Sequence, residues 1–224
     1  GVLAGNATIT YTLPTGCIRT TEATVNPLPA DIKGTMDVCE GLTTTLANVT
    51  PDGTWTSSNS AIADIDASGV VTGMTAGTAT ITYTLTATGC IKTALVTVNP
   101  LPAVIAGNHE VCEGLTTTLT NTSTGGTWMS DNTSVATIGS ASGVVTGVVA
   151  GTAGITYTLP TGCIMTTVIT VNALPDAITG TMTVCEGLTT TLADATPGGI
   201  WTSGATSIAT VDASGVVTGH VAGN

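Results

Sequence analysis

Six cysteines carry the most reactive side chains of this chain, and their spacing is regular. They form two series with 73 residues between successive members: Cys17, Cys90 and Cys163, and then Cys39, Cys112 and Cys185. Thiols at such long intervals typically pair as disulfides in an oxidising compartment. Structural zinc needs four ligands, usually cysteines and histidines in closely spaced pairs, and the sequence offers no such set. The cysteines therefore predict disulfide chemistry and an extracellular or cell-surface location.

The same interval governs the rest of the chain, which is a tandem repeat. Trp55, Trp128 and Trp201 follow it. Gly-Leu-Thr-Thr-Thr-Leu occurs at 41–46, 114–119 and 187–192, and Ser-Gly-Val-Val-Thr-Gly occurs at 68–73, 142–147 and 214–219. Self-similarity at a fixed period is typical of stacked copies of one structural unit.

Proline-containing links predict where each unit ends. Val-Asn-Pro-Leu-Pro stands at 25–29 and 98–102, and Val-Asn-Ala-Leu-Pro stands at 171–175. Proline cannot donate a hydrogen bond to a β-ladder and restricts the residue before it, so these links are short and semi-rigid. We expect the last strands of a preceding repeat at 1–26, complete repeats at 27–99 and 100–172, and a repeat lacking its last strands at 173–224. The chain reads as an excerpt of a longer array.

Composition excludes several classes of protein. Only 8% of the residues are charged, Lys and Arg together number 3, and the net charge is −11. Nucleic acids and anionic membranes need clustered cations, which this chain lacks. No apolar run reaches the ~20 residues of a membrane-spanning helix. A hydrophobic content of 42% argues against disorder.

Alternating apolar and polar residues predict short β-strands. In 80–85, Ile81, Tyr83 and Leu85 alternate with threonine, and Leu42, Thr44 and Leu46 share one face. Asp-Ala-Ser-Gly at 66–69 is typical of a turn between two strands. About seven such strands per repeat, with regular turns and no helical period, predict an all-β fold of tandem immunoglobulin-like sandwiches.

Several motifs resemble a known family, the bacterial immunoglobulin-like repeats of group 2. The resemblance rests on Trp-Thr-Ser-Ser-Asn at 55–59, Ile-Ala-Asp-Ile-Asp at 62–66, Ser-Gly-Val-Val-Thr-Gly at 68–73 and Ala-Gly-Thr-Ala-Thr-Ile-Thr-Tyr at 76–83. Val-Cys-Glu-Gly, Thr-Gly-Cys and the proline links resemble variants in large surface proteins of gliding bacteria. The resemblance implies an extracellular array without enzymatic activity, and it specifies fold better than function.

The disulfide partners remain open between three alternatives. Within a repeat, Cys39 would pair with Cys90 and Cys112 with Cys163. In an immunoglobulin-like sandwich, however, the turns that hold these cysteines lie at opposite ends. A six-residue strand spans ~20 Å, and the Cα atoms of a disulfide lie within ~7 Å. Across the junction, Cys39 could reach Cys163; Cys112 and Cys185 would then pair with later repeats, and Cys17 with an earlier one. Free thiols are the third alternative.

The aromatic residues have a structural interpretation and a functional one. A tryptophan on the third strand is a hallmark core position of this fold, although an exposed row could also stack on sugars. We expect core positions for Trp55, Trp128 and Trp201, and for the inward-facing Tyr11, Tyr83 and Tyr157.

Catalytic and metal sites find little support. His109 and His220 do not recur at equivalent positions, and a Ser-His-Asp site needs all three groups held together. Calcium needs 6–8 oxygen ligands. The carboxylates near turns or cysteines are Asp64, Asp66, Asp212, Glu40, Glu113 and Glu186. Ser140 aligns with Asp66 in the second repeat, so that turn is not an acidic site in every repeat. We expect no cofactor, with structural calcium at a junction as a minor alternative.

The sequence favours a structural role over a binding role. The first hypothesis is a segment of a long extracellular fibre or adhesin stalk, in which each repeat contacts only its neighbours. The alternative is an adhesive module whose sandwich-end loops recognise a glycan or a surface protein. The expected partners are therefore neighbouring repeats or protomers, and a glycan or surface ligand in the second case. A further possibility is that one chain completes the last repeat of another by strand complementation.

Overall fold

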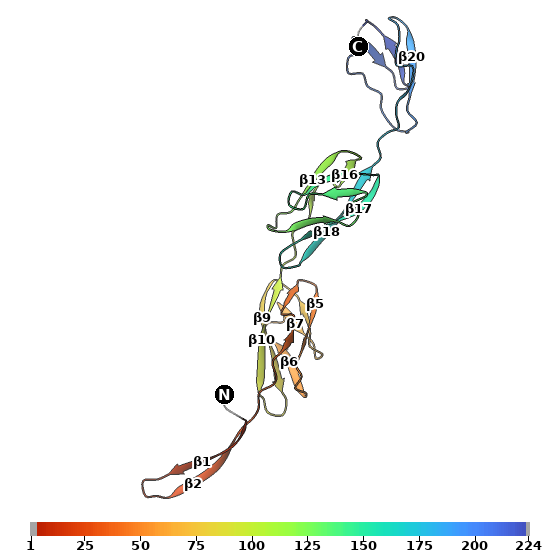
Figure 1. The fold of residues 1–224 in the computed structure, drawn as a ribbon. Helices are drawn as coiled ribbons and strands as arrows, with labels where there is room; N and C mark the ends of the chain where they lie inside the picture. The colour runs from red at the N-terminus through yellow and green to blue at the C-terminus, as the bar shows by residue number, and fades with distance from the viewer. Residues whose placement is uncertain (1–3, 223–224) are drawn as a thin grey trace.

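The structure, a computed structural model, describes residues 4–222, and its regular elements in that range are all β-strands. Figure 1 shows an isolated hairpin at the N-terminal end, two sandwiches and a half-sandwich at the C-terminal end, arranged one after another. Valine, isoleucine and threonine form these strands because branching at Cβ suits an extended backbone. The expected all-β, immunoglobulin-like class is confirmed. We call 27–99 repeat 1, 100–172 repeat 2 and 173–222 repeat 3.

Repeat 1 consists of two four-stranded sheets. One has the order β4-β10-β9-β6, and the other has the order β3-β5-β8-β7. The β4–β10 pairing is parallel and the other pairings are antiparallel. The strands are β3 (Lys33–Gly34), β4 (Asp37–Cys39), β5 (Thr43–Ala47), β6 (Gly53–Ser57), β7 (Ala63–Ile65), β8 (Val70–Gly73), β9 (Gly77–Leu85) and β10 (Ile91–Asn99).

Repeat 2 reproduces this topology strand for strand. Its sheets have the orders β12-β18-β17-β14 and β11-β13-β16-β15. The strands are β11 (Ala106–Gly107), β12 (Glu110–Cys112), β13 (Thr116–Thr120), β14 (Thr127–Ser130), β15 (Ala136–Ile138), β16 (Val144–Gly147), β17 (Gly151–Thr158) and β18 (Ile164–Asn172). The period seen in the sequence is therefore also the period of the structure.

Each complete sandwich encloses a core of aliphatic side chains. In repeat 1 the most deeply buried are Leu46, Val71, Ile81, Val96 and Val98, which are at most 1% exposed. Their counterparts in repeat 2 are Leu119, Val145, Ile155, Ile169 and Val171, which are at most 2% exposed. Without phenylalanine, each core combines these and smaller aliphatic side chains with one Trp–Tyr pair. Burial of each aliphatic side chain contributes ~1.5–3 kcal/mol relative to its exposure.

The first and last parts of the described chain are not two-sheet sandwiches. The N-terminal hairpin consists of β1 (Gly5–Thr12) and β2 (Ile18–Val25) alone, and all of its residues are exposed. Repeat 3 has one sheet with the order β19-β20-β22-β21. Its strands are β19 (Thr179–Gly180), β20 (Thr189–Ala193), β21 (Ala209–Val211) and β22 (Val216–Gly219). Its second sheet is absent from the described residues.

Candidate functional site

The junction between repeats 1 and 2 carries a covalent bond. Cys39 ends β4 in repeat 1, and Cys163 lies in the turn between β17 and β18 of repeat 2. They form a disulfide with a Cα–Cα distance of 5.7 Å and a sequence separation of 124 residues. This is the cross-junction alternative of the sequence analysis. The bond ties two neighbouring sandwiches together.

Local structure explains why these two cysteines meet. Parallel pairing with β10 places Cys39 beside Asn99, at the end of repeat 1 from which the link to repeat 2 departs. The turn of repeat 2 is closed by the Leu159 N–H, which donates to the Cys163 carbonyl at 2.9 Å. Cys163 is 1% exposed, and its sulfur lies 3.9 Å from the carbonyl oxygen of Asn99. The hairpin turn of repeat 2 thus rests on the last strand of repeat 1.

The same topology is incompatible with a disulfide inside repeat 1. Cys90 precedes Ile91, the first residue of β10, whereas Cys39 is paired with Asn99, the last residue of that strand. A nine-residue strand separates the two cysteines by ~27 Å, far beyond the ~7 Å that a disulfide spans. Cys17, Cys90, Cys112 and Cys185 are unpaired.

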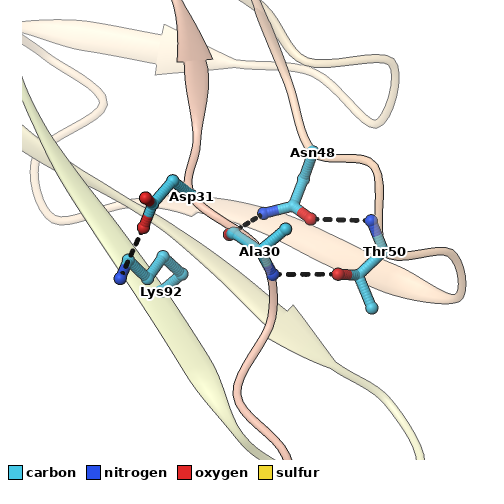
Figure 2. Close-up of polar contacts among 5 residues, drawn as sticks. All are labelled: Ala30, Asp31, Asn48, Thr50 and Lys92. Atoms are coloured by element: carbon cyan, nitrogen blue, oxygen red, sulfur yellow. Dashed lines mark hydrogen bonds and ion pairs between the residues drawn. The ribbon is translucent and has the colours of Figure 1, made fainter.

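A polar clamp fixes the chain where it enters each sandwich (Figure 2). In repeat 1 the Ala30 N–H donates to Thr50 Oγ1 at 2.9 Å, and Asn48 Nδ2 donates to the Ala30 carbonyl at 2.7 Å. The Thr50 N–H donates to Asn48 Oδ1 at 2.9 Å. The clamp therefore anchors the residue that follows the proline link to the loop between β5 and β6.

Repeat 2 contains the same clamp, and repeat 3 contains part of it. Asn121 Nδ2 donates to the Ala103 carbonyl at 2.6 Å, and the Ala103 N–H donates to Ser123 Oγ at 2.9 Å. In repeat 3 the Asp176 N–H donates to Thr196 Oγ1 at 2.8 Å. This clamp was not predicted from the sequence. Its signal was an Asn or Asp followed two residues later by Thr or Ser, recurring at the 73-residue period.

An ion pair adds to the clamp of repeat 1. Lys92 Nζ on β10 lies 2.7 Å from Asp31 Oδ1 (Figure 2). Its hydrogen bond and positive charge lower the pKa of Asp31 below the usual value for an aspartate. Repeat 2 has Val104 and Met165 at the corresponding positions. The ion pair is therefore particular to repeat 1, whereas the Asn clamp is shared.

The tryptophans and tyrosines of the complete repeats pair in the sandwich. The ring centroids of Trp55 and Tyr83 lie 4.7 Å apart, and those of Trp128 and Tyr157 lie 4.6 Å apart. The Tyr83 hydroxyl donates to the Thr50 carbonyl at 2.6 Å and accepts from the Gly53 N–H at 3.0 Å. Tilted aromatic pairs stabilise a fold beyond the area they bury, and Trp128, Tyr83 and Tyr157 are at most 8% exposed.

Tyr11 has a different environment from the other two tyrosines in the described residues. Its side chain is 71% exposed, because β1 and β2 have no facing sheet among the described residues. Trp201 in repeat 3 is correspondingly half-buried and pairs with no tyrosine in residues 4–222. The two aromatic side chains without a partner therefore belong to the two incomplete ends.

The carboxylates considered for calcium support backbone turns instead. Asp66 Oδ1 accepts hydrogen bonds from the Ser68 hydroxyl at 2.7 Å and from the Val70 N–H at 2.9 Å, which lower its pKa. Asp212 accepts the equivalent bonds from Ser214 and Val216, and its pKa is lowered for the same reason. Asp64 is exposed on β7. Within residues 4–222, no three His, Cys, Asp or Glu side chains gather as a metal site would require.

The glutamates that follow the cysteines and the two histidines are also placed by the fold. Glu40 Oε1 accepts from the Ala76 N–H at 2.7 Å, and Glu113 Oε1 accepts from the Ala150 N–H at 2.6 Å. Glu186 is exposed in repeat 3. His109 and His220 lie in different repeats, and His220 Nε2 is 2.9 Å from Thr210 Oγ1. Across 4–222, no helix has the length and apolarity needed to cross a bilayer.

Comparison with known proteins agrees with this architecture. Residues 32–98 match the model of the bacterial Ig-like domain (group 2). The chain is similar to Ice-binding protein 1 of Shewanella frigidimarina (strain NCIMB 400), at 31% identity over 209 residues, covering 79% of this chain and 23% of that protein. It therefore spans about a quarter of the length of that relative.

Two solved structures are also similar. One is a C-terminal 282-residue fragment of intimin in complex with the intimin-binding domain of its translocated receptor: 18% identity, 66% of this chain, 67% of that chain and a TM-score of 0.44. The other is invasin, a bacterial integrin-binding protein: 14% identity, 99% of this chain, 60% of that chain and a TM-score of 0.34. The family match and the two-sheet topology together identify the unit at residues 32–98 as a bacterial Ig-like domain of group 2.

Proposed function

We propose that this chain is a structural segment of a long extracellular fibre or adhesin stalk, in which disulfides between neighbouring repeats carry tension. The observation that supports this role most directly is the Cys39–Cys163 bond. A disulfide inside one sandwich protects only that sandwich. A disulfide between two sandwiches joins them even when the link between them is pulled, so the array transmits force through covalent bonds.

Further features support a load-bearing, non-catalytic role outside the cell. Disulfides persist mainly in oxidising compartments. The clamps at Asn48 and Asn121 fasten each sandwich to the link that precedes it. The three Lys and Arg residues offer trypsin-like proteases few cleavage sites. Together these features favour a long segment that resists pulling forces and proteolysis.

Single-molecule force spectroscopy tests the proposal. The oxidised chain is held by its two ends and stretched until both complete sandwiches unfold. The disulfide prevents the 124 residues that separate Cys39 from Cys163 from being stretched out. At ~3.5 Å per extended residue, the fully stretched oxidised chain is therefore ~400 Å shorter than the reduced chain.

A matched pair of variants gives the control. Cys39→Ser should lengthen the fully stretched chain by this ~400 Å. Cys112→Ser removes an unpaired thiol at the equivalent position of repeat 2, and it should leave the extension of the oxidised chain unchanged. Equal extension of the wild-type chain and the Cys39→Ser variant would contradict the proposed role.

A further inference from the structure

One loop of repeat 1 contains an aspartate in an unusual backbone conformation. Asp52 lies between β5 and β6, and its φ of 62° is the one positive value at a residue other than glycine within residues 4–222. The corresponding residues of repeats 2 and 3 are Gly125 and Gly198, with φ values of 82° and 86°. Glycine adopts this left-handed conformation readily, whereas a Cβ atom makes it costly. Repeat 1 therefore has a carboxyl group at a position where the loop favours glycine.

The residue that follows Asp52 has to be glycine. A Cβ atom on Gly53 would overlap the ring of Tyr83, and one on Gly126 would overlap the ring of Tyr157. The N–H groups of the two glycines also donate to these tyrosine hydroxyls, both at 3.0 Å. The tyrosine of each complete sandwich thus requires the glycine. In repeat 1 this requirement creates Asp52-Gly53, the only Asp-Gly or Asn-Gly pair in the sequence.

An aspartate that precedes glycine can rearrange with water as the only other reactant. The nitrogen of Gly53 attacks Cγ of Asp52 and forms an N–Cγ bond, while one carboxyl oxygen leaves with two protons as water. The product is a cyclic succinimide. Water then breaks the bond between the nitrogen and the original backbone carbonyl carbon, so that the chain continues through the side-chain carboxyl group as isoaspartate. Glycine favours the attack because no Cβ atom shields its nitrogen.

Hydrogen bonds hold the Asp52–Gly53 peptide group on both sides. The Asp52 carbonyl accepts from the Thr86 N–H at 3.1 Å and from the Thr86 hydroxyl at 2.7 Å. On the other side, the Gly53 N–H donates to the Tyr83 hydroxyl, which donates to the Thr50 carbonyl at 2.6 Å. The attack requires the nitrogen to lose its proton and the peptide plane to turn toward Cγ. Both changes break these hydrogen bonds, so they restrain the reaction although Asp52 itself is exposed.

We propose that Asp52-Gly53 is a site of isoaspartate formation, which the hydroxyls of Tyr83 and Thr86 keep unreactive while the loop is closed. Opening of the loop releases the peptide group and starts the rearrangement. No enzyme, oxidant or reductant takes part. The inference goes beyond a load-bearing role and does not depend on it, because it concerns the chemistry of a single loop.

The modification would also weaken the entry to repeat 1. The rearrangement inserts Cβ of Asp52 into the backbone between Thr50 and Gly53. The Tyr83 hydroxyl then no longer fits both the carbonyl of Thr50 and the N–H of Gly53. Thr50 also belongs to the polar clamp that holds the incoming chain (Figure 2). An opening that leads to isoaspartate therefore makes the next opening easier, and the change persists after the loop closes.

Ageing of the oxidised 224-residue chain tests the proposal. The wild-type, Tyr83→Phe and Thr86→Val chains are incubated at neutral pH and digested, and isoaspartate at residue 52 is measured by peptide mapping. A synthetic peptide of residues 49–56 gives the rate without the fold. We expect the wild-type chain to rearrange at least ~100-fold more slowly than the peptide, Tyr83→Phe about tenfold faster than the wild-type chain, and Thr86→Val about fivefold faster. Equal rates for the wild-type chain and the peptide would overturn the proposal.

Two control variants separate release of this peptide group from a general loss of stability. Tyr157→Phe removes the equivalent hydroxyl from repeat 2, where Gly125 replaces the aspartate, and should leave the rate at Asp52 within ~2-fold of the wild-type rate. Val96→Ala opens a cavity in the core of repeat 1 and keeps both hydroxyls, so it should accelerate the reaction less than Tyr83→Phe does. Equal acceleration by Val96→Ala and Tyr83→Phe would place the reaction in the unfolded repeat and would contradict control by the two hydroxyls.

Discussion

At the scale of single residues, the fold depends on a few polar contacts that recur from repeat to repeat. The Tyr83 hydroxyl bridges the Thr50 carbonyl and the Gly53 N–H, and Tyr157 makes the same bridge between Ser123 and Gly126. A partly buried backbone group that loses its partner costs more than the net value of a hydrogen bond. Tyrosine therefore serves here both as an apolar core residue and as a tie between loop and strand.

Removing one hydroxyl tests this dual role. Tyr83→Phe keeps the ring beside Trp55 but leaves the Thr50 carbonyl and the Gly53 N–H without a partner, so we expect repeat 1 to lose about 1–3 kcal/mol of unfolding free energy. Tyr11→Phe, on the exposed hairpin, should change the stability of the reduced single chain by less than ~0.5 kcal/mol. Urea unfolding of both variants at low protein concentration measures the difference, and equal losses would contradict the role of the hydroxyl.

The aspartate turns make stability depend on acidity in a defined direction. Hydrogen bonds from Ser68 and Val70 lower the pKa of Asp66 in the folded chain. The stability that the ionised carboxylate supplies is therefore complete above the pKa of about 3.9 of the unfolded chain and is lost as pH falls through the lower pKa of the folded chain. Asp212 behaves in the same way.

A comparison of stability at pH 6 and pH 2.5 checks the direction of this pH dependence. The urea midpoint of repeat 1 should fall more in the wild-type chain than in Asp66→Asn, whose amide oxygen accepts the same bonds without titrating. The corresponding turn of repeat 2, at 139–143, has no carboxylate. A larger acid loss in Asp66→Asn than in the wild-type chain would contradict the assignment.

At the scale of strands and sheets, the leucine that ends the Gly-Leu-Thr-Thr-Thr-Leu motif contributes differently to the stability of repeat 1 and repeat 3. Leu46 on β5 is 1% exposed and belongs to the same core cluster as Ile81 of β9 and Val96 of β10. The equivalent Leu192 on β20 is only half-buried. A side chain contributes through the water it excludes and the atoms it touches. The contribution of this leucine thus depends on a hairpin that repeat 3 does not contain.

Truncation of the two leucines measures that dependence. Leu46→Ala should cost about 2–5 kcal/mol, the usual range for a fully buried leucine, and Leu192→Ala should cost less than half as much in the single chain. Chemical denaturation with separate probes for each repeat provides the measurement. Costs of equal size would show that repeat 3 has a closed core.

Much of the strand arrangement could be predicted from the sequence, for physical reasons. Alternation of period two sets one face of a long strand inward, and the strand expected at 80–85 lies within β9. The two-residue strands β3 and β11 could not be predicted, because their pairing with β5 and β13 depends on the path of the link. The clamps of Asn48 and Asn121 could not be predicted either, because a local sequence motif does not reveal a hydrogen bond to a residue 18 positions away. The inward register predicted for Tyr83 and Tyr157 agrees with their burial.

At the scale of the whole molecule, the repeats form a row, and a disulfide joins repeats 1 and 2 in addition to the proline link between them. The proline links position each sandwich, and the Cys39–Cys163 bond joins the end of one sandwich to the turn of the next. The sequence could place these cysteines at opposite ends of a repeat but could not decide among their partners. That decision depends on how repeat 2 is oriented on repeat 1, which is set by contacts across the junction.

The bond between repeats also predicts a large effect on stability. A cross-link that closes a loop of 124 residues restricts the unfolded chain, and the loop-entropy relation gives about 4–5 kcal/mol for a loop of this size. Cys39→Ser should therefore lower the thermal midpoint of the oxidised chain, whereas Cys112→Ser should leave it within the error of the measurement at low protein concentration. Equal midpoints for the wild-type chain and Cys39→Ser would contradict a constraining bond.

Disulfide mapping without reduction tests the central claim most directly. The chain is purified under oxidising conditions, blocked with a thiol reagent, digested with pepsin at low pH to prevent exchange, and analysed by mass spectrometry. The structure predicts one cross-linked peptide pair that joins the segment around Cys39 to the segment around Cys163. Pairs joining Cys39 to Cys90 and Cys112 to Cys163 would instead make each repeat a separate closed unit and would contradict the account of a stapled row.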